Sequence, residues 1–154
     1  MLRTMSQEVP TTTHTIEFPY TRTLGPILSG FLTGLRDGRI LAITTGAGKV
    51  ICPPTEWDPW TGDAVDPALT EVGPGGTVET WAWVQTPTPK HPLDHAFAFA
   101  LIKLDGADTA MMHAVDAGDM SAMETGMRVA PRWKTDRIGH ITDIEAFVPE
   151  GKGG

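Results

Sequence analysis

The feature that most constrains this chain is a pair of tight turns on either side of a short apolar segment and two prolines. The turns lie at residues 46–48 and 58–62, and Pro53 and Pro54 lie between them. This is the layout of a zinc ribbon, in which each turn carries a Cys-x2-Cys pair and four thiolates hold one ion. The four corresponding positions here are Thr44, Ala47, Asp58 and Thr61. Because only Asp58 has a metal-binding side chain, we expect a degenerate ribbon over 39–63 without zinc.

Size, charge and cysteine content narrow the class of protein. The 154 residues suffice for one ordinary domain. A formal net charge of -7 disfavours a nucleic-acid partner, since phosphate contacts need a basic surface. Cys52 is the only cysteine, so no disulfide can form within the chain and a reducing compartment is expected. The first 20 residues lack the apolar core of a signal peptide, and no membrane span is expected; we therefore expect a soluble cytoplasmic protein.

The first quarter of the chain predicts an extended arm and one helix. Residues 1–22 show only weak alternation, so the arm either lies on a partner or is loosely ordered. Over 23–38, Pro26 suits the first helical position, and apolar residues that include Ile27, Phe31 and Leu35 recur at helical spacing. A helix this short is unstable alone, so its apolar stripe must dock on the domain or on a partner.

Strand and turn patterns alternate through the rest of the chain. Short strands are expected at 40–44 and 49–52, and 63–76 is expected to be a loop. Five further strands are expected at 77–84, 96–104, 109–115, 127–135 and 141–148, with a turn or short helix at 120–126. Five strands with a helix-like break before the fourth are typical of an OB barrel. The expected fold is therefore mainly β, with an N-terminal helix, a degenerate zinc-ribbon-like hairpin, a five-stranded OB-fold barrel over 64–150 and a flexible tail at 151–154.

Several motifs, taken in order, resemble the DUF35 OB-fold family, in which a helical segment and a rubredoxin-like zinc ribbon precede an OB barrel. They are residues 31–41, the Pro53-Pro54 pair, and residues 76–78, 99–106 and 126–129. The resemblance covers about residues 24–149 and fits the ribbon without a gap. The missing ribbon cysteines make the chain similar to a branch of the family that has lost the metal.

The resemblance implies an accessory subunit that is not an enzyme alone. Members of this family associate with thiolase-like enzymes, including lipid-transfer and sterol-carrier types and aldolases, with hydroxymethylglutaryl-CoA synthase, or with MaoC-like hydratases. It implies a heteromeric complex that uses acyl-CoA as its substrate, in steroid or lipid side-chain degradation. Two alternatives remain open: a free-standing acyl-CoA or small-ligand binding module, and a single-stranded nucleic-acid OB protein, which the acidic composition disfavours.

Two sets of residues are candidate binding sites. We expect a partner to bind the helix and the ribbon turns, through Ile27, Phe31, Leu35, Pro53, Pro54, Trp57 and Trp60. The two tryptophans either fill the metal-free knuckle, which is the favoured interpretation, or are exposed anchors for a partner. Arg128, Arg132 and Lys134 would share one strand face and are candidates for coenzyme A phosphates, although an ordinary solvated face is the simpler interpretation.

No catalytic or metal site is expected from the remaining polar residues. Cys52 lies between Ile51 and Pro53, which indicates a half-buried structural thiol. His113 lies within an expected strand, where a satisfied, partly buried histidine is the favoured interpretation. His91 and His95 lie four residues apart, but a proline separates them in an expected loop, so a metal-binding pair is disfavoured.

Overall fold

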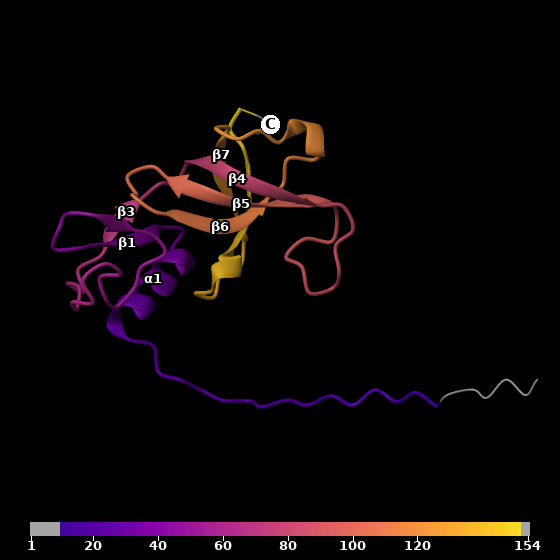
Figure 1. Ribbon diagram of the computed structural model, residues 1–154, viewed down its shortest axis with the longest axis horizontal. Coiled ribbons are helices and arrows are strands. Elements are labelled where there is room, and N and C mark those ends of the chain that lie inside the picture. The colour runs from indigo at the N-terminus through magenta and orange to yellow at the C-terminus, as the bar shows by residue number, and fades with distance from the viewer. Residues whose placement is uncertain (1–9, 152–154) are drawn as a thin grey trace, which may run out of the picture.

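The computed structural model describes residues 10–151, so residues 1–9 of the predicted arm and residues 152–154 of the predicted tail lie outside it. The elements, in order, are α1 (Pro26–Arg36), β1 (Ile40–Thr44), β2 (Val50–Ile51), β3 (Thr70–Val72), β4 (Gly76–Val84), β5 (Phe97–Leu104), β6 (Ala110–Val115), η1 (Met120–Ala122), β7 (Arg128–Trp133), η2 (Ile141–Asp143) and β8 (Ile144–Pro149). Figure 1 shows α1 and a small sheet at one end, the barrel beside them, and the arm extending away from both. Within the described range, no helix is long and apolar enough to cross a membrane.

Five strands close into a barrel in the order β4-β5-β6-β8-β7, and β7 pairs back to β4. This order, with its parallel contact between β6 and β8, confirms the expected OB-fold barrel. The barrel closes at Gly76, which pairs with both Leu104 and Val129. A Cβ at Gly76 would lie 2.8 Å from the Lys103 carbonyl oxygen, so the closure point has room only for glycine.

The ribbon forms a three-stranded sheet in the order β2-β1-β3. Strand β3 lies within the segment 63–76 that we expected to be a loop, and it pairs with β1 through Ile40 and Val72. Three residues among turn formers are too short a run to show strand periodicity, which explains the error. The sheet is joined to the β5–β6 turn, because the Val50 amide donates to Asp108 Oδ2 (2.8 Å) and the Cys52 amide donates to Thr109 Oγ1 (2.9 Å).

Helix α1 docks on its own domain. Ile27, Phe31 and Leu35 are all buried within the chain, so the prediction that these three side chains contact a partner is corrected. Gly34 allows the helix to approach β1 closely, since a Cβ there would lie 2.9 Å from Leu41 Cγ. The sequence allowed the apolar stripe of the helix to pack either on its own domain or on a partner. In the structure it packs in the chain's own core.

Candidate partner-binding surface

A buried carboxylate organises the second ribbon turn. Asp58 is only 6% exposed, and its Oδ1 accepts hydrogen bonds from the Trp60 amide (2.9 Å) and the Thr61 amide (3.3 Å). The Gly62 amide also donates to the Asp58 carbonyl oxygen, at 2.8 Å. An aspartate that accepts the amide two residues on is a common device for fixing a turn. One of the four knuckle positions therefore holds its turn by direct hydrogen bonds.

The first ribbon turn is also held by a side-chain oxygen that accepts a backbone amide, one residue after the knuckle position Thr44. Thr45 is buried, and its Oγ1 accepts from the Lys49 amide at 3.1 Å. Behind the turns, a small aliphatic cluster fills the ribbon, formed by Ile27, Ile43, Ile51, Val65 and Leu69. In the part of the chain that the structure describes, no group of three or more His, Cys, Asp or Glu side chains could hold a metal ion.

We expect Asp58→Ala to lower the free energy of unfolding by about 1–2 kcal/mol, because two backbone amides lose their acceptor. Asp58→Asn retains an oxygen at that position and should cost less. Urea denaturation of the three proteins measures the difference, and a chelator should leave all three midpoints unchanged. A large chelator-induced loss of stability in the unmodified protein would contradict this account of the turn.

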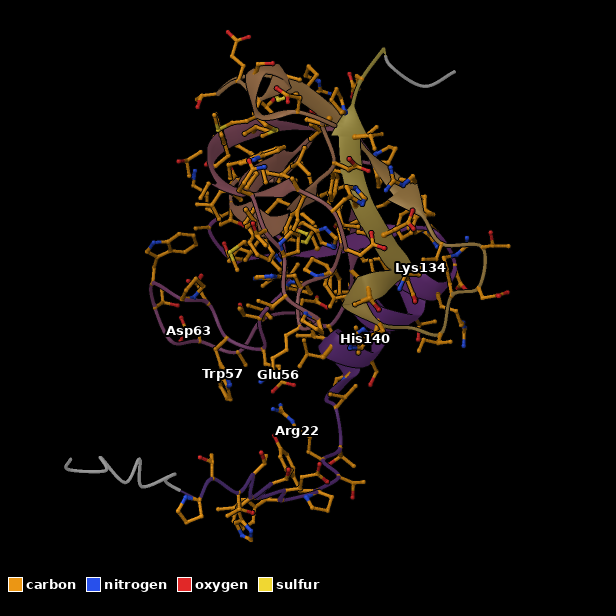
Figure 2. All side chains as sticks on the ribbon, turned by 90° about the vertical axis from the view of Figure 1, so that its right-hand side faces the viewer. Arg22, Glu56, Trp57, Asp63, Lys134 and His140 are labelled. Carbon is orange, nitrogen blue, oxygen red and sulfur yellow. The ribbon has the colours of Figure 1, made fainter. Side chains whose placement is uncertain are left out.

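Trp57 and Trp60 project outward from this turn. They are 59% and 64% exposed, so the favoured interpretation that they fill the knuckle is wrong, and the aliphatic cluster takes that place. Figure 2 shows Trp57 at the edge of the molecule, beside Glu56 and Asp63. Of the two prolines expected at the partner surface, Pro53 is exposed and Pro54 is buried. The exposed-anchor interpretation of the two indoles is the one compatible with this geometry.

The two indoles are among the exposed large hydrophobic side chains of the chain, most of which lie in two segments. Ten large hydrophobic side chains are exposed among the described residues, and six of them lie in the arm and the second turn. We call these six the docking surface: Ile16, Phe18, Tyr20, Leu24, Trp57 and Trp60. The arm starts beside the turn, since a Cβ at Gly25 would overlap the Glu56 carboxylate, and Figure 2 shows Arg22 pointing toward Glu56. Large apolar groups that remain exposed in a soluble fold are typical of an interaction site.

The predicted cationic stripe is largely neutralised. Arg128 donates to both Asp105 oxygens at 2.6 Å and pairs with Glu150 at 3.1 Å. Arg132 pairs with Glu145 at 2.5 Å and with Asp116 at 3.0 Å. A phosphate would have to compete with two carboxylates at each arginine. The geometry therefore favours ordinary surface ion pairs at the two arginines. Lys134 is exposed and follows β7, past the register shift between Arg132 and Trp133.

Cys52 and His113 have structural environments. Burial raises the pKa of the Cys52 thiol to about 12, so it remains protonated and unreactive at neutral pH. Burial also lowers the pKa of His113, although hydrogen bonds to the Ile141 and Ala114 backbone oppose this. The Ala114 amide donates to His113 Nδ1 at 2.9 Å, which leaves Nε2 to face the Ile141 carbonyl oxygen at 3.4 Å. Both residues are satisfied components of the fold.

One exposed histidine bridges two carboxylates, a connection that sequence patterns did not indicate. His95 Nδ1 lies 3.0 Å from Asp94 Oδ1, and Nε2 lies 3.3 Å from Asp116 Oδ2. The hydrogen bond to Asp94 is the largest cause of a raised His95 pKa; burial opposes it, and the hydrogen bond and charge of Asp116 add to the increase. Asp116 also pairs with Arg132. The bridge ties the loop between β4 and β5 to the end of β6.

We expect His95→Gln to lower the melting temperature by about 2 °C at pH 5.5 and by less at pH 8.5. A group whose pKa is raised by folding stabilises the folded protein fully at pH values below its pKa in the unfolded state. That stabilisation is lost as the pH rises through its pKa in the folded state. Thermal melts at the two pH values measure this, with His14→Gln in the exposed arm as the control. An equal loss at both pH values would show that protonation is not involved.

The barrel topology and the attached ribbon define an OB-fold protein with an N-terminal ribbon. Residues 69–134 match the family model of the ChsH2 C-terminal OB-fold domain. This match, together with two solved DUF35 structures of the same fold, supports the resemblance to the DUF35 OB-fold family that the motifs indicated. No curated protein sequence matches the chain.

Two solved structures share the fold at low sequence identity. A chain of the Ltp2-ChsH2(DUF35) aldolase is 18% identical, with a TM-score of 0.60, and the match covers 84% of this chain and 98% of that one. A DUF35 protein of unknown function from Sulfolobus solfataricus is 12% identical, with a TM-score of 0.54, and the match covers 66% and 74% of the two chains. At these identities the structures establish the common fold.

Proposed function

We propose that this chain is a non-catalytic accessory subunit that binds a thiolase-like or aldolase partner and helps to shape its acyl-CoA site. The match to the ChsH2 OB-fold model supports this assembly, because a neighbour that covers 84% of the chain comes from the Ltp2-ChsH2(DUF35) aldolase. A lipid-transfer-type thiolase partner that acts on steroid or lipid side chains is the specific form we favour. A MaoC-like hydratase is the other partner class that the family resemblance implies.

The observation that carries the proposal is the docking surface. Exposed tryptophans on an ordered turn are typical anchors of protein interfaces, since a large ring buries much area at little entropic cost. Here Asp58 fixes the turn that presents Trp57 and Trp60. The helix α1 and the aliphatic cluster support that turn from behind. The surface is therefore rigid where the indoles stand.

The geometry favours a subunit over a free-standing acyl-CoA binding module. The cleft beside His113 has a volume of about 190 Å³, smaller than the roughly 300–1,000 Å³ typical of small-molecule sites. Two larger clefts, of about 400 and 430 Å³, are lined mainly by loop residues. The two arginines expected to receive coenzyme A phosphates are each paired with two carboxylates. An acyl-CoA contact by this chain would therefore be completed by surfaces of the partner.

Co-expression with thiolase-like and MaoC-like enzymes from the same organism tests the proposal. We expect a stable heteromeric complex with the thiolase-like enzyme in size-exclusion chromatography with light scattering. The isolated chain should not turn over an acyl-CoA. Absence of a complex with either enzyme, together with tight coenzyme A binding by the chain alone, would instead favour the binding module.

A further inference from the structure

Over residues 15–21 of the arm, large apolar side chains alternate with smaller or polar ones. Over residues 10–24, the large non-proline apolar residues occupy even positions: Ile16, Phe18, Tyr20 and Leu24. The odd positions from 11 to 23 hold five threonines, Glu17 and Pro19. Because side chains alternate between the two faces of an extended chain, Ile16, Phe18 and Tyr20 lie together on one face, and Thr15, Glu17 and Thr21 lie on the other. This pattern is typical of a strand with one buried face.

The backbone of the arm is also suited to pairing on one edge. In an extended strand, the N–H and C=O groups of alternate residues point to opposite edges. Pro19 lacks an N–H and interrupts the edge formed by the odd residues. No even residue from 12 to 24 is a proline, so the other edge has every donor. The residues that carry the apolar side chains therefore also carry the intact pairing edge.

The arm's own fold does not use these groups. Ile16, Phe18 and Tyr20 are 68%, 83% and 82% exposed. Residues 12–23 make no backbone–backbone hydrogen bond with any other described residue, and Figure 1 shows the arm running away from the helix and the barrel. The match to the Ltp2-ChsH2(DUF35) neighbour covers 98% of that chain but only 84% of this one. This chain therefore has additional sequence beyond the fold that the two share.

We propose that residues 12–22 bind the partner enzyme as an added β-strand, which pairs through its even-residue edge and places Ile16, Phe18 and Tyr20 in an apolar groove. This inference rests on the proposed function and extends its interface from the ribbon turn along the arm. The arm leaves the body at Gly25, beside Glu56 of that turn, so both segments face the same partner.

The chemistry of the arm defines the surface that would receive it. Three apolar side chains at alternate positions span about 13 Å along a strand, so the groove must be that long and lie beside an unpaired strand edge. Over residues 10–24 the arm has one acidic side chain, Glu17, and one basic side chain, Arg22. The groove therefore needs to be apolar and has no need of a strong charge.

The alternation supplies a matched pair of variants. The apolar-face variant is Ile16→Ser, Phe18→Ser and Tyr20→Ser, and the polar-face variant is Thr15→Ser, Glu17→Ser and Thr21→Ser. Both leave the fold intact, since all six positions lie in the exposed arm, and thermal melts verify this. The affinity of each for the thiolase-like enzyme that co-expression identifies as the partner is measured by biolayer interferometry. Amide hydrogen exchange of the arm is compared in the free chain and the complex.

We expect the apolar-face variant to bind at least tenfold more weakly and the polar-face variant to bind within threefold of the unmodified chain. In the complex, amides of even residues from 14 to 22 should exchange more slowly than those of odd residues. Unchanged binding by both variants, equal weakening of both, or arm-dependent dimerisation of the chain alone would overturn the inference. If the unmodified chain forms no complex, the proposed function fails and the inference fails with it, a result distinct from the other three.

Discussion

Asp143→Ala should lower the free energy of unfolding by about 3 kcal/mol, the largest loss of stability that we expect from a single polar residue. Asp143 is 1% exposed. Its Oδ1 accepts from the Ile138 amide at 3.1 Å, and its Oδ2 accepts from the Gly139 amide at 2.7 Å and the His140 amide at 3.0 Å. Removing the carboxylate leaves all three donors without their acceptor.

The loss of stability should extend beyond the loop, because α1 packs against the segment between β7 and β8. Arg137 Nε donates to the Arg36 carbonyl oxygen at 2.9 Å, at the end of the helix. A Cβ at Gly139 would lie 3.3 Å from the Leu32 carbonyl oxygen, so the loop lies directly against α1. Without Asp143, the loop loses the hydrogen bonds that hold this shape.

Urea denaturation measures the effect, and Asp136→Ala removes a carboxylate from the same loop as a control. Asp136 is exposed, so its loss should change stability by less than about 0.5 kcal/mol. Burial raises the pKa of Asp143, but the three backbone amides outweigh it and the net pKa is lowered. The stabilisation is therefore present above about pH 4, the unfolded value, and is lost as the pH falls through the folded value. A loss that persists unchanged at pH 2 would contradict this origin.

The fold was predictable from sequence wherever a pattern was long. The apolar stripe of α1 and the extended runs of β4 and β5 each repeat their period several times, so their positions were predicted well. Strand β3 has only three residues and acquires its structure from pairing with β1, a contact 30 residues away that local pattern does not contain. Whether the stripe of α1 faced the domain or a partner also depended on such distant contacts.

The candidate site was predictable in its residue types and not in its exposure. The absence of cysteines at the four knuckle positions predicted a turn without a thiolate site. No local sequence pattern showed that Asp58 would turn inward and the neighbouring indoles outward. Trp57 and Trp60 are equally compatible with a core or an interface by composition. The charge of Arg128 and Arg132 suggested a phosphate site, because their partners Asp105 and Asp116 lie on other elements. The alternation of the arm was a local signal, and only its exposure shows that nothing in the described chain covers it.

Trp57→Ala and Trp60→Ala should each weaken binding to the thiolase-like partner by about 30-fold, equivalent to about 2 kcal/mol. Each indole is more than half exposed in the free chain, so its truncation removes interface area without opening a cavity in the ribbon. The free energy of unfolding should therefore change by less than about 0.5 kcal/mol. Isothermal titration calorimetry of the purified variants against the partner measures the loss.

Met120→Ala is the matched control for this pair. Met120 is also exposed, at 53%, but it lies in η1, at the far end of the barrel from the ribbon (Figure 1). Its truncation removes a comparable exposed apolar group and should leave affinity within threefold, because it lies outside the docking surface. Equal weakening by all three variants would indicate a general loss of hydrophobic surface, and a larger effect of Met120→Ala would move the interface to the barrel. A selective loss at the two tryptophans would locate the partner on the turn that Asp58 holds in place of a metal site.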